Sequence, residues 1–318
     1  MKKIAGVPKW HTMLLAVTVS LLLTVGLMGC RQKENDEESI RNLLNGSSYT
    51  DESQTRGYSS QDSTLAPGGE PGLGPGADGY ETIPFVRFRR FVPQGGISRS
   101  ILVQIPAYPG YPDTTALATI TSDIHGEFRT LFDTTTHPML VWRKPFHDQA
   151  VRRVYLTKGP DGWHIRKVSP LNITTVDAAY ELRLVSIHVQ AASGEVFELT
   201  TADTLLAKDE LPTFVPGDTV HVQVTVQSSG DSCWVFLHHG RREWPHRWRR
   251  PYFKTGTFTF ERTWSIGSEG FEVPEVRPSA HDAIGWNSLW ADTSQPYVAA
   301  AWGLPYIVKQ PNEAIPEE

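Results

Sequence analysis

The clearest structural signal in this chain of 318 residues is the run TALATITSDIHGEFRTLFD, which occupies residues 115–133. Apolar side chains take even positions in this run, and threonine or charged side chains take most odd positions. The even set is Ala118, Ile120, Ile124, Phe128 and Phe132, and the odd set is Thr119, Thr121, Asp123, His125, Glu127 and Arg129. A period of two is typical of a β-strand with one buried and one solvated face. We therefore predict one long strand here, in a sheet with one apolar face.

The segments around this strand predict further strands and one helix. Strands are expected at residues 98–105, 137–144, 149–156 and 163–168, with the turn KGPDG before the last of them. Residues 82–92 predict a helix, since Pro84 lies early in it and Phe85, Phe88 and Phe91 would share one face. Strand spacing is the open alternative for this segment. The region therefore reads as an antiparallel meander preceded by a short helix.

This order of elements resembles the nuclear transport factor 2-like (NTF2-like) fold, in which N-terminal helices are cradled by a curved antiparallel sheet. The residues that carry the resemblance are VRRVYL at 151–156 and the hairpin DGWHI at 161–165. It covers about residues 80–175, to which the helix near Asn35 is a candidate addition, and we predict residues 80–177 to be one domain. The resemblance implies an α+β fold class and a cone-shaped interior in which several enzymes of the family place a histidine and an aspartate.

Residues 178–310 predict a second, all-β domain. Val220, Val222, Val224 and Val226 alternate with polar residues, and shorter alternations occur near residues 185–189, 232–238, 256–264, 297–302 and 306–309. Many short strands with Gly and Pro turns argue for a β-sandwich, and the domain looks like an immunoglobulin-like one. Residues 280–290 are expected to form a helical turn, with Ile284 and Leu289 facing inward. Residues 311–318 are a C-terminal tail.

The N-terminus has the pattern of an export signal. Three lysines precede an apolar run at residues 13–28, and a small residue then precedes Cys30. This order predicts a signal peptide over residues 1–29. The ending Leu27-Met28-Gly29-Cys30 resembles the lipobox of bacterial lipoproteins. The resemblance implies a diacylglycerol on the Cys30 thiol, fatty acids such as palmitate, and Cys30 as the mature N-terminus. An uncleaved transmembrane anchor is the alternative, but the run is shorter than the roughly 20 residues of a spanning helix.

Residues 30–79 read as a lipidated N-terminus, a short helix and a linker. The helix is expected to start near Asn35 or Asp36 and to end at Gly46, with acidic residues in its first turn. Residues 47–79 are rich in Ser, Gly and Pro, so we predict a flexible tether there. Arg31 follows the cysteine, whereas aspartate at that position retains lipoproteins in the inner membrane of enteric bacteria. We therefore expect an outer-membrane protein on the periplasmic face or the cell surface.

Charge and cysteine content narrow the function classes. The chain has net charge −5, and loss of the three signal-peptide lysines leaves −8. No predicted domain is basic enough to suggest nucleic acid as a partner. The two cysteines are Cys30 and Cys233, so an exported chain lipidated at Cys30 has no intrachain disulfide. Cys233 lies in the strand-like run SCWVFL and is expected to be a buried, inert thiol.

Several titratable groups invite a catalytic interpretation that their spacing does not support. Asp123, His125, Glu127 and Arg129 lie opposite the apolar face of their strand, so we expect them in solvent. His147 and Asp148 are neighbours on a strand and would point to opposite faces, as would His238 and His239. His164 is a further candidate, and His246 would need its loop to fold back to join the other two histidines. The sequence has no zinc-type spacing and no nucleophile-elbow, phosphate-loop or zincin motif, so no metal, cofactor or catalytic residue is predicted.

The loop RREWPHRWRRPY at residues 241–252 is the most unusual polar segment. It holds five arginines within ten residues, while residues 178–318 have a net charge of −7. The predicted partner-binding residues are Arg241, Arg242, Trp244, Arg247, Trp248, Arg249, Arg250 and Tyr252. Arginine pairs with phosphate or carboxylate, and tryptophan stacks on sugars or cations. An anionic glycan or an envelope protein is the expected partner. A loop that merely closes the sandwich, with arginine stems packed over the indoles, is the alternative.

Taken together, the sequence predicts a lipid-anchored cell-envelope protein with a non-catalytic binding or structural interaction role. The alternative is a small-molecule-binding protein or an enzyme that uses the cavity of the NTF2-like domain. The interior of residues 80–177 separates the two hypotheses. A hollow interior with convergent polar groups favours the alternative, and an interior filled with apolar side chains favours the binding role.

Overall fold

The computed structural model describes residues 35–52, 64–65, 87–106, 114–132, 140–230, 232–239, 248–267, 273–289 and 294–317. The chain divides into two compact units, Met1–Leu44 and Asn45–Glu318, which are described separately. The described residues of the first unit are helical, and this helix ends at Gly46, as the sequence predicts. None of the helices in the described ranges is long and apolar enough to cross a membrane. The predicted signal peptide and Cys30 lie outside those ranges.

Two long strands form the spine of the second unit. β4 (Thr115–Phe132) and β5 (Leu140–Gly159) pair in unbroken antiparallel register over the whole length of β4. The predicted alternation in β4 is confirmed, since Ile120 and Phe128 are buried whereas His125 is exposed. The alternating pattern therefore positions a polar outer face and an apolar inner face along the entire spine.

Two strands lie end to end along the outer edge of β4. β3 (Ile97–Gln104) pairs with its first half, and β2 (Arg87–Phe91) pairs with its second half. Gly126 of β4 stands where one partner gives way to the other. A Cβ at Gly126 would lie 2.4 Å from the carbonyl oxygen of Phe91 and 2.8 Å from the ring of Phe146. Only glycine allows this close approach, so Gly126 is required where the partner strands change.

The other edge of the spine is built in the same way. β6 (Gly162–Val168) and β7 (Leu171–Thr175) both pair with β5. Ser169 bridges the break between them: its amide donates to the carbonyl of Arg153 at 2.8 Å, and its hydroxyl accepts from the Arg153 amide at 2.9 Å. The short β10 (Leu206–Ala207) adds to β6. These bonds keep the backbone satisfied while the chain changes direction.

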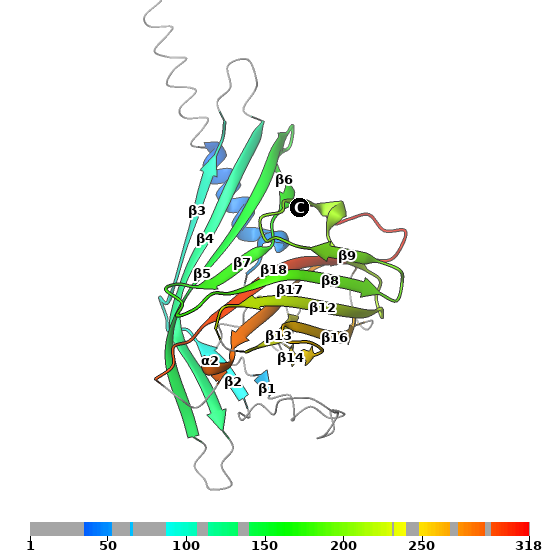
Figure 1. Ribbon diagram of the computed structural model, residues 1–318. Helices are drawn as coiled ribbons and strands as arrows, with labels where there is room; N and C mark the ends of the chain where they lie inside the picture. Colours follow the sequence, from blue (N-terminus) through cyan, green and yellow to red (C-terminus); the bar gives the residue numbers. More distant parts are fainter. Residues whose placement is uncertain are drawn as a thin grey trace, which may run out of the picture. The chain divides into compact units, whose positions relative to one another are not determined.

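From β7 the same sheet continues into the C-terminal half of the chain. It passes through β18 (Ala299–Val308), β17 (Glu275–Gly285), β13 (Cys233–His239) and β14 (Trp248–Pro251), and β11 (Thr213–Phe214) pairs in parallel with β18. α2 (Trp286–Leu289) follows β17. At the far end β1 (Thr64–Leu65) pairs with β2 and also contacts β14. The two ends of the path therefore meet, and the 13-stranded sheet is strongly curled (Figure 1).

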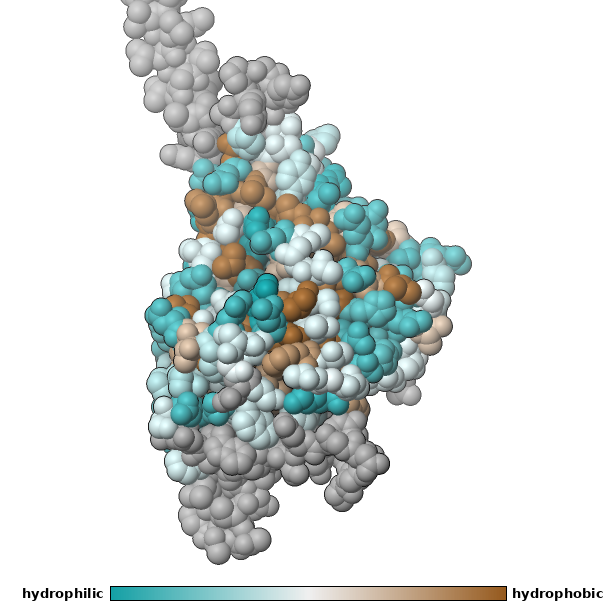
Figure 2. All heavy atoms as spheres, viewed as in Figure 1, coloured by the Kyte–Doolittle hydropathy of each residue, from teal (hydrophilic) through white to brown (hydrophobic). Residues whose placement is uncertain are grey.

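A second, five-stranded sheet packs against the C-terminal part of the first. Its strand order is β15 (Phe253–Lys254), β16 (Thr259–Ser265), β12 (Thr219–Ser228), β8 (Leu182–Ala191) and β9 (Val196–Leu199). Trp264 of β16 meets Phe214 and Tyr306 of the first sheet, with ring centroids 6.4 and 6.3 Å apart. Over β8 and β9, Figure 2 shows mostly hydrophilic and intermediate residues, with hydrophobic ones in small groups. This sheet therefore has one face in the core and one in solvent.

The interior of the curled sheet is filled with apolar side chains. One buried cluster draws on β2, β4, β5, β7, β13, β17, α2 and β18. Its members are Phe88, Ile124, Phe128, Phe146, Ala150, Leu171, Ile173, Trp234, Phe236, Ile284, Leu289, Tyr297, Ala299 and Ala301. Phe88 contacts the rings of Phe128 and Phe236, with centroids 5.3 and 4.8 Å away. Residues on both sides of position 178 therefore share one core.

The predicted α+β fold class is wrong. The described chain is mostly β, with an extended curled antiparallel sheet and no NTF2-like set of helices. The predicted immunoglobulin-like sandwich is wrong as well, because one of its two layers is continuous with the strands of residues 80–177 through the β7–β18 pairing. The error arose because local alternation identifies strands without showing which distant strands they join.

Three local predictions also need correction. Within the predicted helix 82–92, the described residues 87–91 form strand β2, which was the open alternative. The predicted strands 137–144 and 149–156 belong to one strand, β5, and the helical turn at 280–290 is confined to α2.

Parts of the predicted tether are held on the fold. Ser48–Thr50 form a 3-10 turn, η1, and a second such turn within the described residues is η3 (Lys208–Glu210). Tyr49 in the first of them is fully buried, and its hydroxyl donates to the carbonyl of Pro316 at 2.8 Å. Burial of an aromatic ring outweighs the low order that composition alone predicts for this stretch. The flexible tether predicted for 47–79 therefore does not begin at residue 47.

Candidate functional site

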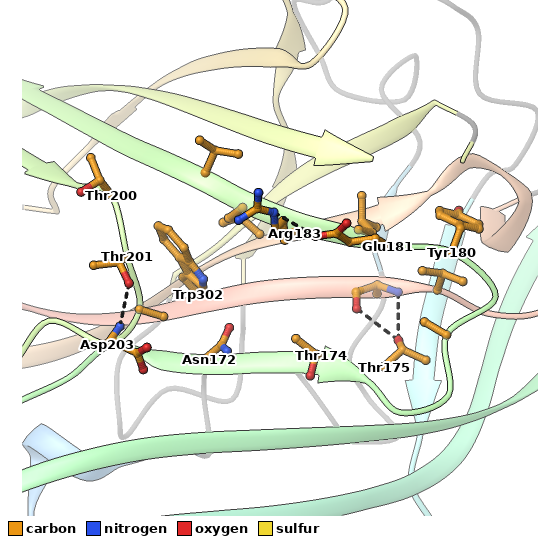
Figure 3. A pocket seen from close by; sticks show the side chains of 17 residues that line it. Asn172, Thr174, Thr175, Tyr180, Glu181, Arg183, Thr200, Thr201, Asp203 and Trp302 are labelled. Carbon is orange, nitrogen blue, oxygen red and sulfur yellow. Dashed lines mark hydrogen bonds and ion pairs between the residues drawn. The ribbon is translucent and has the colours of Figure 1, made fainter. Parts of the chain in front are cut away.

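A groove with a volume of about 470 Å³ lies between the two sheets, among the described residues. One side is formed by β7 and β18, and the other by the start of β8 and by residues 200–203. Figure 3 shows side chains from all four segments pointing into the space between them. The polar and aromatic lining residues are Asn172, Thr174, Thr175, Tyr180, Glu181, Arg183, Thr200, Thr201, Asp203 and Trp302.

Strand pairing explains the side of the groove that β7 and β18 form. Asn172 on β7 stands directly opposite Trp302 on β18, and Thr174 stands opposite Ala300. Residues that face each other across an antiparallel pair have side chains on the same face. Asn172 and Thr174 therefore present an amide and a hydroxyl on the same face as the Trp302 indole.

A β-bulge shapes the opposite side, at the start of β8. β8 pairs with β12, and its register shifts so that Leu184 faces Val226 while Ser186 faces Thr225. Val185 is therefore the extra residue of the bulge, and 36% of its surface is exposed. Bulges re-aim neighbouring side chains and occur often beside binding sites. Here both residues line the groove, with Val185 partly exposed and Leu184 buried.

Two aromatic side chains line the groove, Tyr180 at one end and Trp302 toward the other (Figure 3). Trp302 is 6% exposed, so only part of its indole is accessible. Tyr180 is clamped between two glycines: a Cβ at Gly230 would lie 2.5 Å from its ring, and a Cβ at Gly285 would lie 1.8 Å from its hydroxyl oxygen. The two glycines therefore fix the position of the Tyr180 ring.

The charged side chains of the groove are paired with one another or with a neighbour. The guanidinium of Arg183 lies 3.0 Å from the Glu181 carboxylate and also donates to the side chain of Gln227 at 2.6 Å. Asp203 forms an ion pair with Arg153 of β5. The groove therefore offers hydroxyls, an amide and aromatic rings together with locally compensated charge.

Six of the eight predicted partner-binding residues have no described side chain. Arg241, Arg242, Trp244 and Arg247 lie outside the described residues, and the side chains of Trp248 and Arg249 in β14 are not described either.

Arg250 and Tyr252 are described. Arg250 is partly buried. Burial, and then the positive charges of Arg250, Arg262 and Arg277, lower the pKa of His239 to about 3, so these three guanidinium groups converge on one region. Tyr252, by contrast, is 1% exposed. Its hydroxyl shares a hydrogen bond of 2.7 Å with Nδ1 of His281, so it is a core residue and not a contact residue.

The acid–base candidates on β4 lie in solvent, as predicted. Asp123 is 3.5 Å from Nε2 of His147, and the His147 ring stacks on His125 with centroids 3.9 Å apart. Glu127 pairs with Arg129 at 2.7 Å. These groups are partly or fully exposed and already paired, so they lack the enclosed setting of an acid–base site.

The remaining histidines do not form a site either. His147 is half exposed while Asp148 is buried, so the two point to opposite faces as predicted. His164 lies 2.8 Å from Asp161 in the hairpin turn, and His246 is outside the described residues. Within the described ranges no group of three or more His, Cys, Asp or Glu side chains is placed to hold a metal.

Sequence reasoning missed a buried polar network inside the curled sheet. Arg90 pairs with Asp282 and donates from Nε to the hydroxyl of Tyr297 at 2.8 Å. Tyr297 in turn donates to Asp148 at 3.2 Å, and Asp148 accepts from Thr175 at 3.0 Å. The side chains of Arg90 and Asp282 are 0% exposed, so a substrate cannot reach them. The signal available was the even spacing that places Arg90 on the face of Phe88.

The groove was also missed, because its residues come from four distant segments and none of these carries a motif. Comparison of the chain with protein-family models and with curated proteins gave no match.

Proposed function

We propose that this chain is a lipid-anchored cell-envelope protein with a non-catalytic binding role, and that the groove is its main contact site. The lining of the groove supports the proposal. It presents threonine hydroxyls, the Asn172 amide and two aromatic rings, which are side-chain groups that commonly line ligand-binding sites. Its ionisable side chains Glu181, Arg183 and Asp203 are at least half exposed and ion-paired, which is a poor setting for acid–base catalysis.

The anchor remains part of this proposal. The lipobox-like Leu27-Met28-Gly29-Cys30 supports lipidation at Cys30, export, and attachment to the outer membrane. Mass spectrometry of the mature N-terminus tests it. A diacylated or triacylated Cys30 is the expected result, and an unmodified Cys30 or cleavage elsewhere contradicts it.

The arginine-rich loop is a second contact region in the proposal. Arg250 is partly exposed in β14, which supports a positively charged surface there for an anionic glycan or an envelope protein; Arg262 and Arg277 are buried and add nothing to that surface. Tyr252 is not part of that surface because it is buried. Neither nucleic acid nor a cofactor is invoked.

The alternative function depended on a hollow NTF2-like domain. The NTF2-like fold is contradicted, and the inner side of the curled sheet is filled by Phe88, Phe128, Phe146 and their neighbours. We therefore do not propose a catalytic or ligand-binding cavity there.

Binding to purified cell envelopes tests the role of the two regions. Thr174→Trp places an indole in the groove from an exposed position on β7, and Thr263→Trp places one on an exposed position of β16 as the matched control. We expect Thr174→Trp to abolish most binding and Thr263→Trp to leave it unchanged. Replacing Arg241, Arg242, Arg247, Arg249 and Arg250 with Gln should remove the salt-sensitive part of binding. Equal binding by the parent, the Thr174→Trp variant and the arginine-free variant would end the proposal.

A further inference from the structure

We propose that the ligand of the groove is a neutral carbohydrate, bound through its hydroxyl groups. This inference rests on the proposed binding function and adds the chemical class of the ligand. Four observations carry it: the hydrogen-bonding groups of the lining, the aromatic ends, the compensated charge, and the form of the exposed edge of β8.

The lining matches the hydrogen-bonding properties of a sugar. Thr174, Thr200 and Thr201 present hydroxyls, and a hydroxyl both donates and accepts, whereas the hydroxyl of Thr175 is bonded to Asp148 and to the backbone of Ala299. Asn172 adds an amide with both a donor and an acceptor. A sugar hydroxyl likewise donates and accepts, so its pairing with such a wall leaves few polar atoms unsatisfied. A purely apolar ligand would strip water from these groups without replacing the hydrogen bonds.

The size and the ends of the groove fit a short sugar segment. Its volume of about 470 Å³ lies within the range of roughly 300–1,000 Å³ that is usual for small-ligand sites. Tyr180 stands at one end and Trp302 toward the other (Figure 3). Sugar rings have apolar C–H faces that pack on aromatic surfaces, and the glycines beside Tyr180 hold that surface in place before the ligand arrives.

The charge of the groove argues for a neutral ligand. Glu181 and Arg183 neutralise each other, and Arg153 neutralises Asp203. An anionic ligand would meet two carboxylates and would have to break an existing ion pair to reach Arg183. The anionic partner proposed for the arginine-rich loop is thus a different ligand at a different place.

An extended peptide is the competing ligand, because part of β8 has an open edge. Within the described residues, β9 pairs only with residues 187–190 of β8, and no strand pairs with residues 182–186 on that side. A bulge and charged side chains are the devices that protect an edge from strand addition. Residues 182–186 have both, with Val185 as the bulged residue and Arg183 exposed beside it. The edge is therefore poorly suited to pair with a peptide.

The test uses the full-length chain in detergent and two kinds of probe. The first is a panel of neutral oligosaccharides, and the second is the envelope fraction treated with periodate, which cleaves vicinal diols, or with a broad-specificity protease. We expect binding to survive protease and to be lost after periodate. Thr174→Trp should weaken it at least tenfold, Asn172→Ala about threefold or more, and Thr263→Trp not at all. Arginine-free loop variants should bind the oligosaccharides as the parent does, with little change between low and high salt.

The outcomes separate this inference from the proposed function. One outcome is that Thr174→Trp blocks binding, protease treatment abolishes it and periodate treatment leaves it intact. The ligand is then a peptide or protein, which overturns the carbohydrate inference and leaves the proposed binding function standing. Binding at the groove that falls steeply with salt overturns the neutral ligand. Envelope binding that Thr174→Trp leaves intact removes the groove as the site, and with it this inference.

Discussion

Arg90 and Asp282 lie 192 positions apart in the chain and form a two-point ion pair in the centre of the curled sheet, with N–O distances of 2.7 and 3.1 Å. Both side chains are 0% exposed. The central carbon of the Arg90 guanidinium also lies 5.7 and 5.6 Å from the ring centroids of Phe128 and Tyr297. A buried charge of this kind is tolerated only when its partner and its hydrogen bonds are all present. The pair therefore ties β2 at one end of the sheet to β17 near the other.

Breaking this pair should destabilise the fold strongly. Asp282→Asn keeps the shape of the side chain but leaves the Arg90 charge uncompensated, so the free energy of unfolding should fall by about 3–5 kcal/mol. Glu181→Gln is the matched control, since it breaks a pair whose side chains are 57% and 56% exposed and should cost less than about 1 kcal/mol. Urea denaturation monitored by tryptophan fluorescence measures both. Similar small losses in the two variants would contradict the role of the buried pair.

Gly285 is predicted to be required by its contact with Tyr180. In Gly285→Ala the new Cβ would lie 1.8 Å from the Tyr180 hydroxyl oxygen, so the ring must move, at a cost of about 1–3 kcal/mol. Tyr180→Phe removes that oxygen, and the next ring atom is 3.0 Å away, so the same Gly285→Ala change should cost less in this background. Gly256→Ala, whose Cβ would meet nothing closer than 3.4 Å, is the control. Additive losses in the double variant would show that the two residues are not coupled.

The strands that were predicted correctly are those whose pattern is local. The alternation in β4 and the valines of β12 both identify a half-buried strand without reference to the rest of the chain. Val220, Val222 and Val224 are indeed 0% exposed. A local pattern does not state which strand lies beside another. The pairing of Asn172 with Trp302, which makes the sheet continuous and builds the groove, joins residues 130 positions apart and has no local signal.

The segment around Phe88 shows how tertiary contacts decide between two local readings. Phe85, Phe88 and Phe91 fit a helical face, whereas Phe88 and Arg90 fit one face of a strand. The described residues adopt the strand, because Arg90 then reaches Asp282 and Phe88 enters the core. Tyr252 was assigned to a contact surface for a similar reason: composition marks the arginines before it, but burial against His281 is not visible in the sequence.

Stability should fall as the solution is acidified from neutral pH. Burial lowers the pKa of His281 to about 3, and burial with nearby arginines lowers that of His239 to about 3, whereas the ordinary value is 6.5. Both side chains are therefore neutral when folded and bind a proton when unfolded below pH 6.5. The free energy of unfolding should be level above that pH and decrease between pH 6.5 and 3, by up to about 1.4 kcal/mol per pH unit for each histidine.

Denaturation curves at pH 7.5, 6.5, 5.5 and 5.0 measure this slope. His281→Gln removes one of the two groups, so its slope should be about half that of the parent. His188→Gln changes a partly exposed histidine on β8 and should keep the parent slope. An unchanged slope in His281→Gln would show that another group causes the acid sensitivity.

Cys233 should be unreactive until the fold opens. Its side chain is 0% exposed at the start of β13, opposite Gly285, and burial raises the pKa of the thiol to about 12. The thiolate that attacks a disulfide reagent is therefore almost absent at neutral pH. In a chain lipidated at Cys30, Cys233 is the one free thiol, so labelling with a chromogenic disulfide should be slow in buffer and reach one equivalent in urea. Thr263→Cys, at an exposed position, should react at once and serves as the control.

Because labelling must wait for opening, the Asp282→Asn variant should label Cys233 faster than the parent does. A native Cys233 that reacts as fast as the Thr263→Cys thiol would contradict the burial of β13 in the core.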